Sequence, residues 1–420
     1  DAVVTNEGTV TLSSVTFSGN SADIDIANRG TLKIEGTTTR IEKGISGEGK
    51  TEIASGATLE NGAGSRIRQT SITVAGVLTN KNGNANAIEV SEEFEIEKGG
   101  EIETSASAIK AANGIDNEGS VRFTGGTNAN EIRGTGDLLI EGEVTNANGT
   151  AVKQSTITVK EGKTLIVEDI TDVETSGEGI VNEGSVTFRG GTNTNKMIGA
   201  GELNIEGIVI NEAKIEQSTI TVASEKRLTT RADKVVTTNG IVNIGTVTFT
   251  GGKNVNEIRG DNGRLEIAGE VENDNNITQK EIEVTSGEIV NNEGKAIKAD
   301  SVKILTEGEV ENAGIIEAVA IGNRGEIENE GTIIAADITN EASGEIRNTG
   351  AITSTNAIVN KGVMTSEADN IVISGANKEI INSGIYNVTG GTVSYKISGE
   401  SINRGTVNIR DNEVTIGNTV

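Results

Sequence analysis

The 420-residue sequence contains no cysteine, histidine, tryptophan or proline, and each absence excludes something. Without cysteine there is no disulfide framework, thiolate nucleophile or cysteine-based metal site. Without histidine, the commonest side chain for general acid–base catalysis near neutral pH is missing. Without proline, every backbone N–H stays available for hydrogen bonding in a β-sheet. Together these absences favour a chain selected for shape more than for chemistry.

Large hydrophobic side chains are also scarce. Apolar residues make up 34% of the chain and aromatic residues 2%, which is too lean for an ordinary large globular core. A core only one coil wide needs no large side chains to fill it. The 55 glycines are consistent with frequent corners between strands. Disorder is the competing interpretation of this composition, but the strict alternation of residues described below argues against it.

The charge balance narrows the choice of partners. The chain carries 62 acidic and 36 basic residues, a net charge of −26, which argues against nucleic-acid and anionic-membrane partners. No apolar run approaches the roughly 18 residues of a membrane span, so we expect none. The chain begins at Asp1 with neither an initiator methionine nor an apolar leader. We therefore expect a processed or excised segment that is secreted, with its signal removed.

A short motif, Asn-x-Gly followed by any residue and then an aliphatic one, recurs along the chain. Asn and Gly tolerate a left-handed backbone, and an inward β-branched residue suits the strand that follows. Each copy therefore predicts one corner of a coil, and its recurrence predicts one unit stacked on copies of itself. The motif begins at Asn6, Asn28, Asn117, Asn182, Asn243, Asn312, Asn323, Asn329, Asn348, Asn360 and Asn403.

A longer repeat contains this motif. Its first block covers residues 117–123, 182–188 and 243–249, and a Gly-Gly pair follows each copy. The second block covers residues 136–142, 201–207 and 263–269, and the third covers residues 154–159, 217–222 and 279–284. The unit is about 61 to 65 residues long with three strand-rich blocks, or about 21 residues per coil. We expect this long-coil repeat over residues 1–296, and continuous but shorter, less regular coils over 297–420.

Within a block, residues alternate with a period of two. Val186 and Phe188 share one face, while Ser185 and Thr187 share the other, and Asn182 falls on the same side as the apolar pair. Such alternation indicates a half-buried strand with Asn182 pointing inward at the corner. No segment shows a convincing helical face.

These patterns predict an all-β fold, a single-stranded right-handed parallel β-helix of about 20 coils with three short strands per turn. Successive coils would lie about 4.8 Å apart. Equivalent asparagines would then form a ladder of side-chain amides along the axis, with valine over valine and phenylalanine over phenylalanine.

We expect no catalytic, cofactor-binding or metal-binding residues. Acidic pairs such as Glu92 with Glu93, or Asp169 with Asp172, are better explained as a solvated acidic surface than as catalytic pairs. The Gly-Gly-x-Gly-x-Asp pattern of calcium-binding solenoids does not occur. The Gly-Gly-Thr-Asn segments lack the Gly-Lys-Ser/Thr of a phosphate loop, which leaves them as corners.

Ice binding is a further alternative, because Thr-x-Thr pairs recur along the chain. A flat, regular array of hydroxyls would be needed, and these pairs recur only about once per three coils, among charged residues. Solvent-facing threonines that favour β-structure explain them more simply. The pairs are Thr156 with Thr158, Thr219 with Thr221, and Thr246 with Thr248.

Residues 186–195 and 201–207, together with the Asn-x-Gly-x-Ile corners, resemble the passenger repeats of bacterial autotransporters and filamentous-haemagglutinin-like adhesins. The resemblance covers nearly the whole chain, although its motifs are generic. It implies a secreted, surface-exposed β-helix, typically free of cysteine, used for attachment, aggregation or biofilm formation.

We therefore expect a non-enzymatic extracellular protein that acts as a cell-surface fibre, stalk or adhesin. Residues 2–10 and 406–420 show no obvious cap, so we expect self-association, end to end or lateral, with a host or neighbouring-cell surface as a further partner. One alternative is an excised passenger of a longer autotransporter adhesin. Another is a polysaccharide-acting β-helix enzyme, for which a walled groove with converging carboxylates and basic residues would be the sign.

Overall fold

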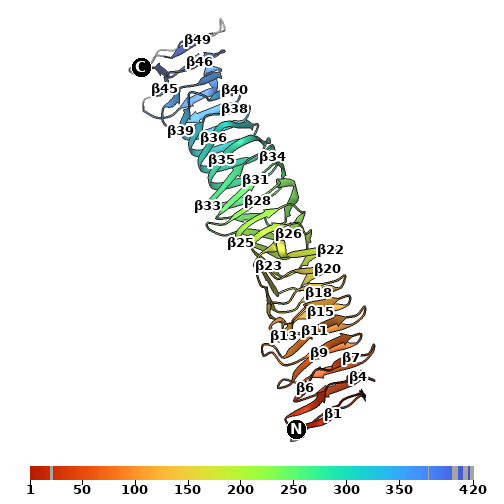
Figure 1. Ribbon diagram of the computed structural model, residues 1–420. Coiled ribbons are helices and arrows are strands. Elements are labelled where there is room, and N and C mark those ends of the chain that lie inside the picture. Colours follow the sequence, from red (N-terminus) through yellow and green to blue (C-terminus); the bar gives the residue numbers. More distant parts are fainter. Residues whose placement is uncertain (19–21, 377, 400–404, 410–414, 417–420) are drawn as a thin grey trace. The chain divides into compact units, whose positions relative to one another are not determined.

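The computed structural model describes residues 1–18, 22–376, 378–399, 405–409 and 415–416. It is an all-β structure, 64% strand and 3% helix, whose parallel sheets form a β-solenoid of about 21 turns. The chain divides into two compact units, Asp1–Ser218 and Thr219–Val420. Within each unit the strands of successive coils lie side by side in chain order (Figure 1). The expected parallel β-helix is confirmed, whereas its handedness and the change of coil type at residue 297 stay predictions.

In the first unit, many strands are short, and they pair in parallel with the coils below and above. For example, β15 (Ser120–Phe123) lies between β12 (Glu101–Thr104) and β18 (Asp137–Ile140), and Val121 is in register with Leu138. A parallel pair requires a long connection between its strands, and here the rest of the coil supplies it. The chain therefore winds around once before each strand meets its neighbour.

In the second unit, several strands bend and run along more than one side of a coil. The longest are β35 (Ile277–Asn291) and β36 (Ala296–Asn312), which pair in parallel along most of their length. Ile282 is in register with Val302, and Val302 with Ile321, so a coil takes about 20 residues. The predicted coil size is thus close to the observed one.

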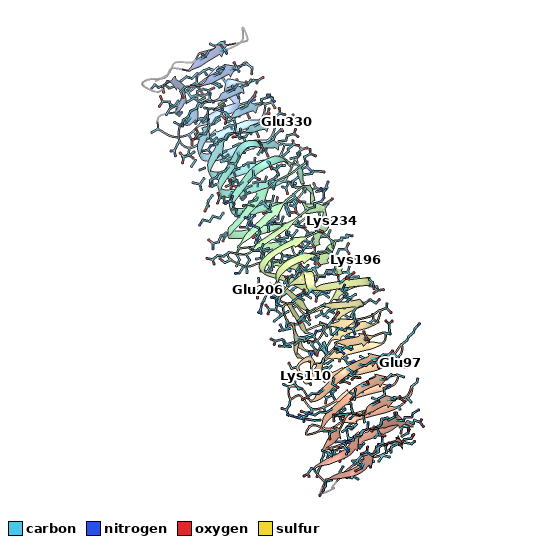
Figure 2. All side chains as sticks on the ribbon, viewed as in Figure 1. Glu97, Lys110, Lys196, Glu206, Lys234 and Glu330 are labelled. Carbon is cyan, nitrogen blue, oxygen red and sulfur yellow. The ribbon has the colours of Figure 1, made fainter. Side chains whose placement is uncertain are left out.

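The core is a single column of stacked aliphatic side chains, as the alternation predicts. Val186 and Phe188 on β23 (Ser185–Asn193) are fully buried, and Asn182 points inward with them. Charged side chains such as Glu206 and Glu330 project outward from the coils (Figure 2). Burial of many small β-branched side chains in this narrow column replaces the aromatic core of a globular protein.

The expected stacking of phenylalanine over phenylalanine is wrong, and valine lies over valine at Val152 and Val173 but not at Val186. Phe188 lies between Val167 of the coil below and Ile205 of the coil above. The reason is that the long repeat does not span a whole number of coils: the residue three coils below Asn182 is Phe123, and not Asn117. Equivalent residues of successive repeats therefore lie in different columns, and a bulky ring is flanked by smaller side chains. The same holds for Phe123, between Thr104 and Ile140, for Phe249, between Thr230 and Ile267, and for Val186, between Leu165 and Leu203.

The predicted asparagine ladder is confirmed. In the second unit, each Nδ2 of one ladder donates to the Oδ1 of the next coil at 2.6 to 3.0 Å, and the last donates to the hydroxyl of Ser366. Its members are Asn254, Asn273, Asn291, Asn312, Asn329 and Asn348. A second ladder joins Asn323, Asn340, Asn360 and Asn382 at 2.7 to 2.9 Å. Because all of these amides are buried, each needs such a partner.

Buried glutamines also bond to asparagines in the interior of the first unit, which the sequence did not indicate. Asn182 donates to Oε1 of Gln217 at 2.6 Å, and Asn117 bonds in the same way to Gln154. Gln217 and Gln154 open the third block of the repeat and are almost fully buried. The glutamine side chain is long enough to reach the asparagine of a different coil. A buried hydrogen bond therefore links the first block of the repeat to the third block.

The glycine of the Asn-x-Gly motif has a different role from the one expected. Within the described residues, neither the asparagine nor the glycine of any motif copy has a positive φ, so no left-handed corner forms there. A Cβ on Gly184 would instead lie 2.3 Å from the carbonyl oxygen of Lys163 in the coil below. The amide N–H of Gly184 also donates to Oδ1 of Asn182 at 3.1 Å. Close stacking of coils, and not backbone handedness, requires glycine here.

The Gly-Gly pairs pack against short 3-10 turns, which the sequence did not predict. Gly191 has a φ of +94°, and a Cβ there would lie 1.9 Å from Oδ1 of Asp169, which precedes η2 (Ile170–Asp172) one coil below. The other turns are η1 (Ala106–Ala108) below Gly126, η3 (Ala232–Lys234) below Gly252, and η4 (Ala368–Asn370) below Gly391. The fourth turn places one more copy of this arrangement beyond residue 297.

Candidate functional site

The acidic pairs weighed as catalytic candidates have separate, local roles. Glu92 and Glu93 are exposed on β11 (Ile88–Ile96), where the strand register shifts after Val90. Asp169 accepts a hydrogen bond from the backbone N–H of Thr171 at 2.9 Å, and Asp172 accepts one from Gly149 at 2.7 Å. Asp169 and Asp172 therefore cap a turn and tie it to the coil below.

The Thr-x-Thr pairs form no flat array of hydroxyls. Thr246 lies between Arg227 and Arg264 of the neighbouring coils, and Thr248 is only 6% exposed. The Thr248 hydroxyl donates to Glu266 at 2.9 Å and accepts from Arg227 at 3.3 Å. Long charged side chains from adjacent coils thus cover the threonine, which leaves little of its hydroxyl for a flat ligand.

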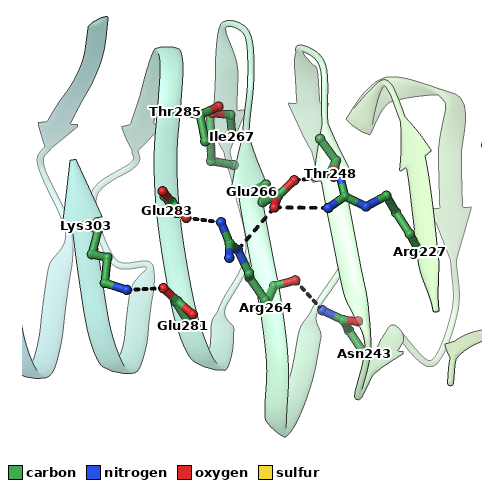
Figure 3. A network of polar contacts seen from close by, with 10 residues as sticks. All are labelled: Arg227, Asn243, Thr248, Arg264, Glu266, Ile267, Glu281, Glu283, Thr285 and Lys303. Atoms are coloured by element: carbon green, nitrogen blue, oxygen red, sulfur yellow. Dashed lines mark hydrogen bonds and ion pairs between the residues drawn. The ribbon is translucent and has the colours of Figure 1, made fainter. Parts of the chain in front are cut away.

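These threonines belong to a network of ion pairs that runs along the stack (Figure 3). Glu266 accepts from Arg227 at 3.0 Å and from Arg264 at 3.2 Å, and Arg264 continues to Glu283. Surface ion pairs of this kind contribute about 0 to 1 kcal/mol each. Because arginine and glutamate side chains alternate along the stack, the negative charge of these carboxylates is neutralised locally on this side of the coils.

On another side of the second unit, carboxylates stack without such alternation. We call this the acidic face: the outward residues of 288–290, 309–311, 326–328 and 345–347. Glu288, Glu309, Glu326 and Glu345 follow one another in register, and Glu311 is in register with Glu328 beside them. Arg347 neutralises only the upper end of the face, where it pairs with Glu326, Glu328 and Glu345.

Three half-buried carboxylates of the acidic face gather where, among the described residues, none of them forms an ion pair, and Arg347 only partly offsets the repulsion at Glu309. Ligand oxygens of Glu288, Glu309 and Glu311 all lie within 4.8 Å of one another. Burial, a hydrogen bond with Glu311 and repulsion from Glu311, Glu309 and Glu270 raise the pKa of Glu288 to about 7. Burial and repulsion from Glu326, Glu311 and Glu328 also raise the pKa of Glu309.

The chemistry of this cluster is proton binding near neutral pH. A carboxyl with a pKa of about 7 is shared between protonated and ionised forms near neutral pH. Three carboxylates are also ligands of the kind that calcium takes, but they offer at most six of the six to eight oxygens that calcium binds, and acidic groups often gather on a surface without an ion. We therefore assign no metal centre to it.

We expect the second unit to be more stable at pH 5.5 than at pH 8. The folded-state pKa of Glu288 lies above its ordinary value of 4.5, so the folded state binds more protons between pH 4.5 and about 7, and stability falls as pH rises through that window. Solvent screens these half-exposed groups, so the loss should be on the order of 1 kcal/mol, or about 2–4 °C in melting temperature.

The matched variant for this measurement is Glu311→Gln, which removes the carboxylate bonded to Glu288 and should flatten the dependence between pH 5.5 and 8. Glu272, Glu281 and Glu379 have lowered pKa values, so their contribution is lost only at more acidic pH. A melting temperature that rises from pH 5.5 to 8 would contradict the assignment.

A hollow of about 760 Å³ lies beside the cluster. Glycines of successive coils line it, together with two basic and three acidic side chains, namely Arg231, Lys253, Glu270, Glu272 and Glu288. Lys253 already pairs with Glu272 at 2.9 Å and with Asp274 at 3.4 Å, and Arg231 pairs with Asp233 at 3.0 Å. Both cations are therefore engaged by the protein's own carboxylates.

Sequence reasoning missed the acidic cluster, although a signal was present. Each strand of the face carries Glu, an aliphatic residue, any residue and Asn, at residues 288–291, 309–312, 326–329 and 345–348. Aligning those blocks by their asparagines would have placed the four glutamates in one column. The Asn-x-Gly corners alone do not show this column, because the glutamates come before the asparagines on each strand.

Comparisons of the chain with models of known protein families, with curated proteins and with solved structures give no match. In the described part of the chain, no helix has the length and apolar character needed to cross a membrane.

Proposed function

We propose that this chain is a non-enzymatic extracellular structural protein that serves as a cell-surface fibre, stalk or adhesin. In this proposal it is secreted by a bacterial-type route. It works like the autotransporter passengers and filamentous-haemagglutinin-like adhesins that its repeats resemble. It is either a self-associating fibre or the excised passenger of a longer adhesin. Its partners would be further copies of itself and a host or neighbouring-cell surface.

The observation that carries the proposal is the unbroken interior ladder. Six successive coils of the second unit are joined by side-chain amide bonds from Asn254 to Asn348, in addition to the backbone bonds of the parallel sheets. Each coil contacts chiefly the coils next to it, so further coils can be added to the stack while the structure of each coil stays the same. Such a fold suits a spacer or stalk.

The polysaccharide-acting enzyme is the weaker alternative. The hollow that contains Glu288 is the feature nearest to the groove that such an enzyme needs. Its two basic residues are held by ion pairs with Glu272, Asp274 and Asp233, so they are not free to orient an anionic sugar. The hollow also lacks histidine, because the chain has none.

To test the proposal, the chain is displayed on a bacterium that neither aggregates nor attaches to surfaces. We expect settling of the cells or their retention on glass to increase. Cells that display the Val247→Asp variant, which should lose its folded coils, are the control. Equal behaviour of the two displayed chains and of bare cells would contradict the proposal, and release of reducing sugars from polysaccharides would favour the enzyme.

A spacer built of sequence repeats should tolerate loss of one repeat. Deleting residues 117–181 joins Asp116 to Asn182, which has the place of Asn117 in the next copy of the repeat. We expect the melting temperature to change little and the first unit to shorten by about 15 Å, slightly more than three rungs of about 4.8 Å, as measured by small-angle scattering.

The matched control deletes residues 117–170, which joins Asp116 to Thr171 in a 3-10 turn and so brings together no equivalent positions of two repeats. This variant should lose the cooperative unfolding transition of the first unit. If both deletions behave alike, the sequence repeat is not the structural unit.

A further inference from the structure

One side of the second unit carries almost no charge. We call it the neutral face: the outward residues of 315–319, 332–336, 351–355 and 371–373. Glu317 is the one charged residue in these four segments, in a chain in which 23% of residues are charged. One coil below, Lys298 is in register with Glu317 and pairs with it at 2.7 Å, so charge ends at the lower rim of the face.

Large apolar side chains are exposed on this face. Ile334, Thr353 and Val372 stand directly above Glu317 in one column, and Ile334 and Val372 are 42% and 53% exposed. Ile315 and Val319 on β37 (Ile315–Asn323) are 42% and 55% exposed. Aliphatic side chains grouped on one flat sheet face are a common mark of an interaction surface.

The charge distribution points to the occupant of this face. The same coils carry the acidic face on another side, and the net charge of −26 makes two copies repel each other wherever their acidic surfaces meet. A second copy can approach closely only where that charge is absent. We propose that the neutral face is a lateral self-association surface, on which a second copy packs face to face about a two-fold axis near Thr353.

The size of the face sets the strength of the pairing. Four rungs of about five residues cover on the order of 300 Å² per copy, well below the roughly 800 Å² per partner of a stable complex. The pair is therefore weak in solution. On a cell surface, where many copies stand side by side, many such contacts act together. This inference names the self-association surface of the proposed function and rests on it.

The absence of cysteine allows a direct test. Thr353→Cys places the only thiol of the chain at the centre of the neutral face, and Thr365→Cys places it on β43 (Val363–Ser366), in register with Arg347 at the end of the acidic face. Both threonines are half-buried residues of one coil. With a short bismaleimide at about 1 mM protein, we expect at least about tenfold more covalent dimer from Thr353→Cys.

Salt and charge substitutions provide a second readout. Raising NaCl from about 0.02 to about 0.5 M should strengthen the pairing, because it screens the net negative charge. The double variant Ile334→Glu with Val372→Glu should weaken association at least about tenfold in sedimentation velocity, because like charges then face each other. The control, Ile208→Glu with Ile210→Glu on β25 (Glu202–Asn211), changes equally exposed residues away from the face and should not.

Equal crosslinking of the two cysteine variants, or a wild-type chain that stays monomeric at about 1 mM in high salt, would overturn the inference. These outcomes are separable from failure of the proposed function. A chain that supports cell attachment but does not crosslink through Thr353→Cys is a surface protein without this lateral contact.

Discussion

Replacing Val247 by Asp should destabilise the coils around it by about 4 kcal/mol or more. Val247 on β31 (Thr246–Phe249) is fully buried and lies between Leu228 and Leu265. A carboxylate there would have neither water nor a cation, and burying an unpaired charge is among the most costly substitutions in a protein. Chemical denaturation and amide hydrogen exchange of β28 (Arg227–Thr230) and β33 (Ile258–Ile267) should both report the loss.

The matched control is Thr246→Asp, one residue earlier on the same strand. Thr246 faces outward between Arg227 and Arg264, so the new carboxylate would meet two guanidinium groups. We expect the stability to change by less than about 1 kcal/mol. If both variants are equally stable, Val247 does not face the core and the inward and outward assignment of the strand is wrong.

Replacing Asn312 by Leu should cost about 2 to 5 kcal/mol, although it leaves the volume of the core nearly unchanged. Asn312 accepts a hydrogen bond from Asn291 at 2.8 Å and donates one to Asn329 at 2.7 Å. The leucine would leave one buried acceptor and one buried donor without that partner, at about 1 to 3 kcal/mol each. The free energy of unfolding of the second unit measures this effect.

Asn292→Leu, next to the ladder, is the comparison. Its side chain bonds to Glu272 at 3.0 Å on the outside of the coil, where water can replace that bond. We expect a loss below about 1 kcal/mol. A loss at Asn312 as small as this would mean that the interior ladder contributes little and that aliphatic burial alone holds the coils together.

The sequence was sufficient for the fold because the repeated alternation carries the same information many times. Period-two patterning identified Val186 and Phe188 as buried and Asn182 as inward, and stacking equivalent coils then required the amide ladder. The coil length followed from the spacing of the blocks. Burial, side-chain direction and coil length depend on residues that are neighbours in the chain and on the stacking of equivalent coils. A single sequence is therefore enough to predict them.

What the sequence did not reveal depends on which residues become neighbours in adjacent coils. Phe188 was expected over another phenylalanine, but the repeat does not span a whole number of coils, and Val167 and Ile205 lie there. Gly184 was assigned a left-handed corner, whereas the carbonyl oxygen of Lys163 in the coil below is what excludes a side chain. Both errors come from reading a motif alone, without the register that brings another coil against it.

The acidic cluster was missed for the same reason. Glu288 and Glu311 are separated by more than one coil length in the chain, and nothing in either local sequence marks its carboxyl as unusual. Only the register of β35 with β36 brings them close enough to share a proton. A perturbed carboxyl in a repeat protein is thus a property of the stack and not of the motif.

The asparagine ladder also makes the interior electrically directional. Every amide from Asn254 to Asn348 donates toward the later coil, and each one after Asn254 accepts from the earlier coil, so their dipoles add instead of cancelling. Six amides of about 3.5 D, if fully aligned, would sum to roughly 20 D. The interior of the second unit therefore has a dipole moment along the ladder, which its net surface charge does not show.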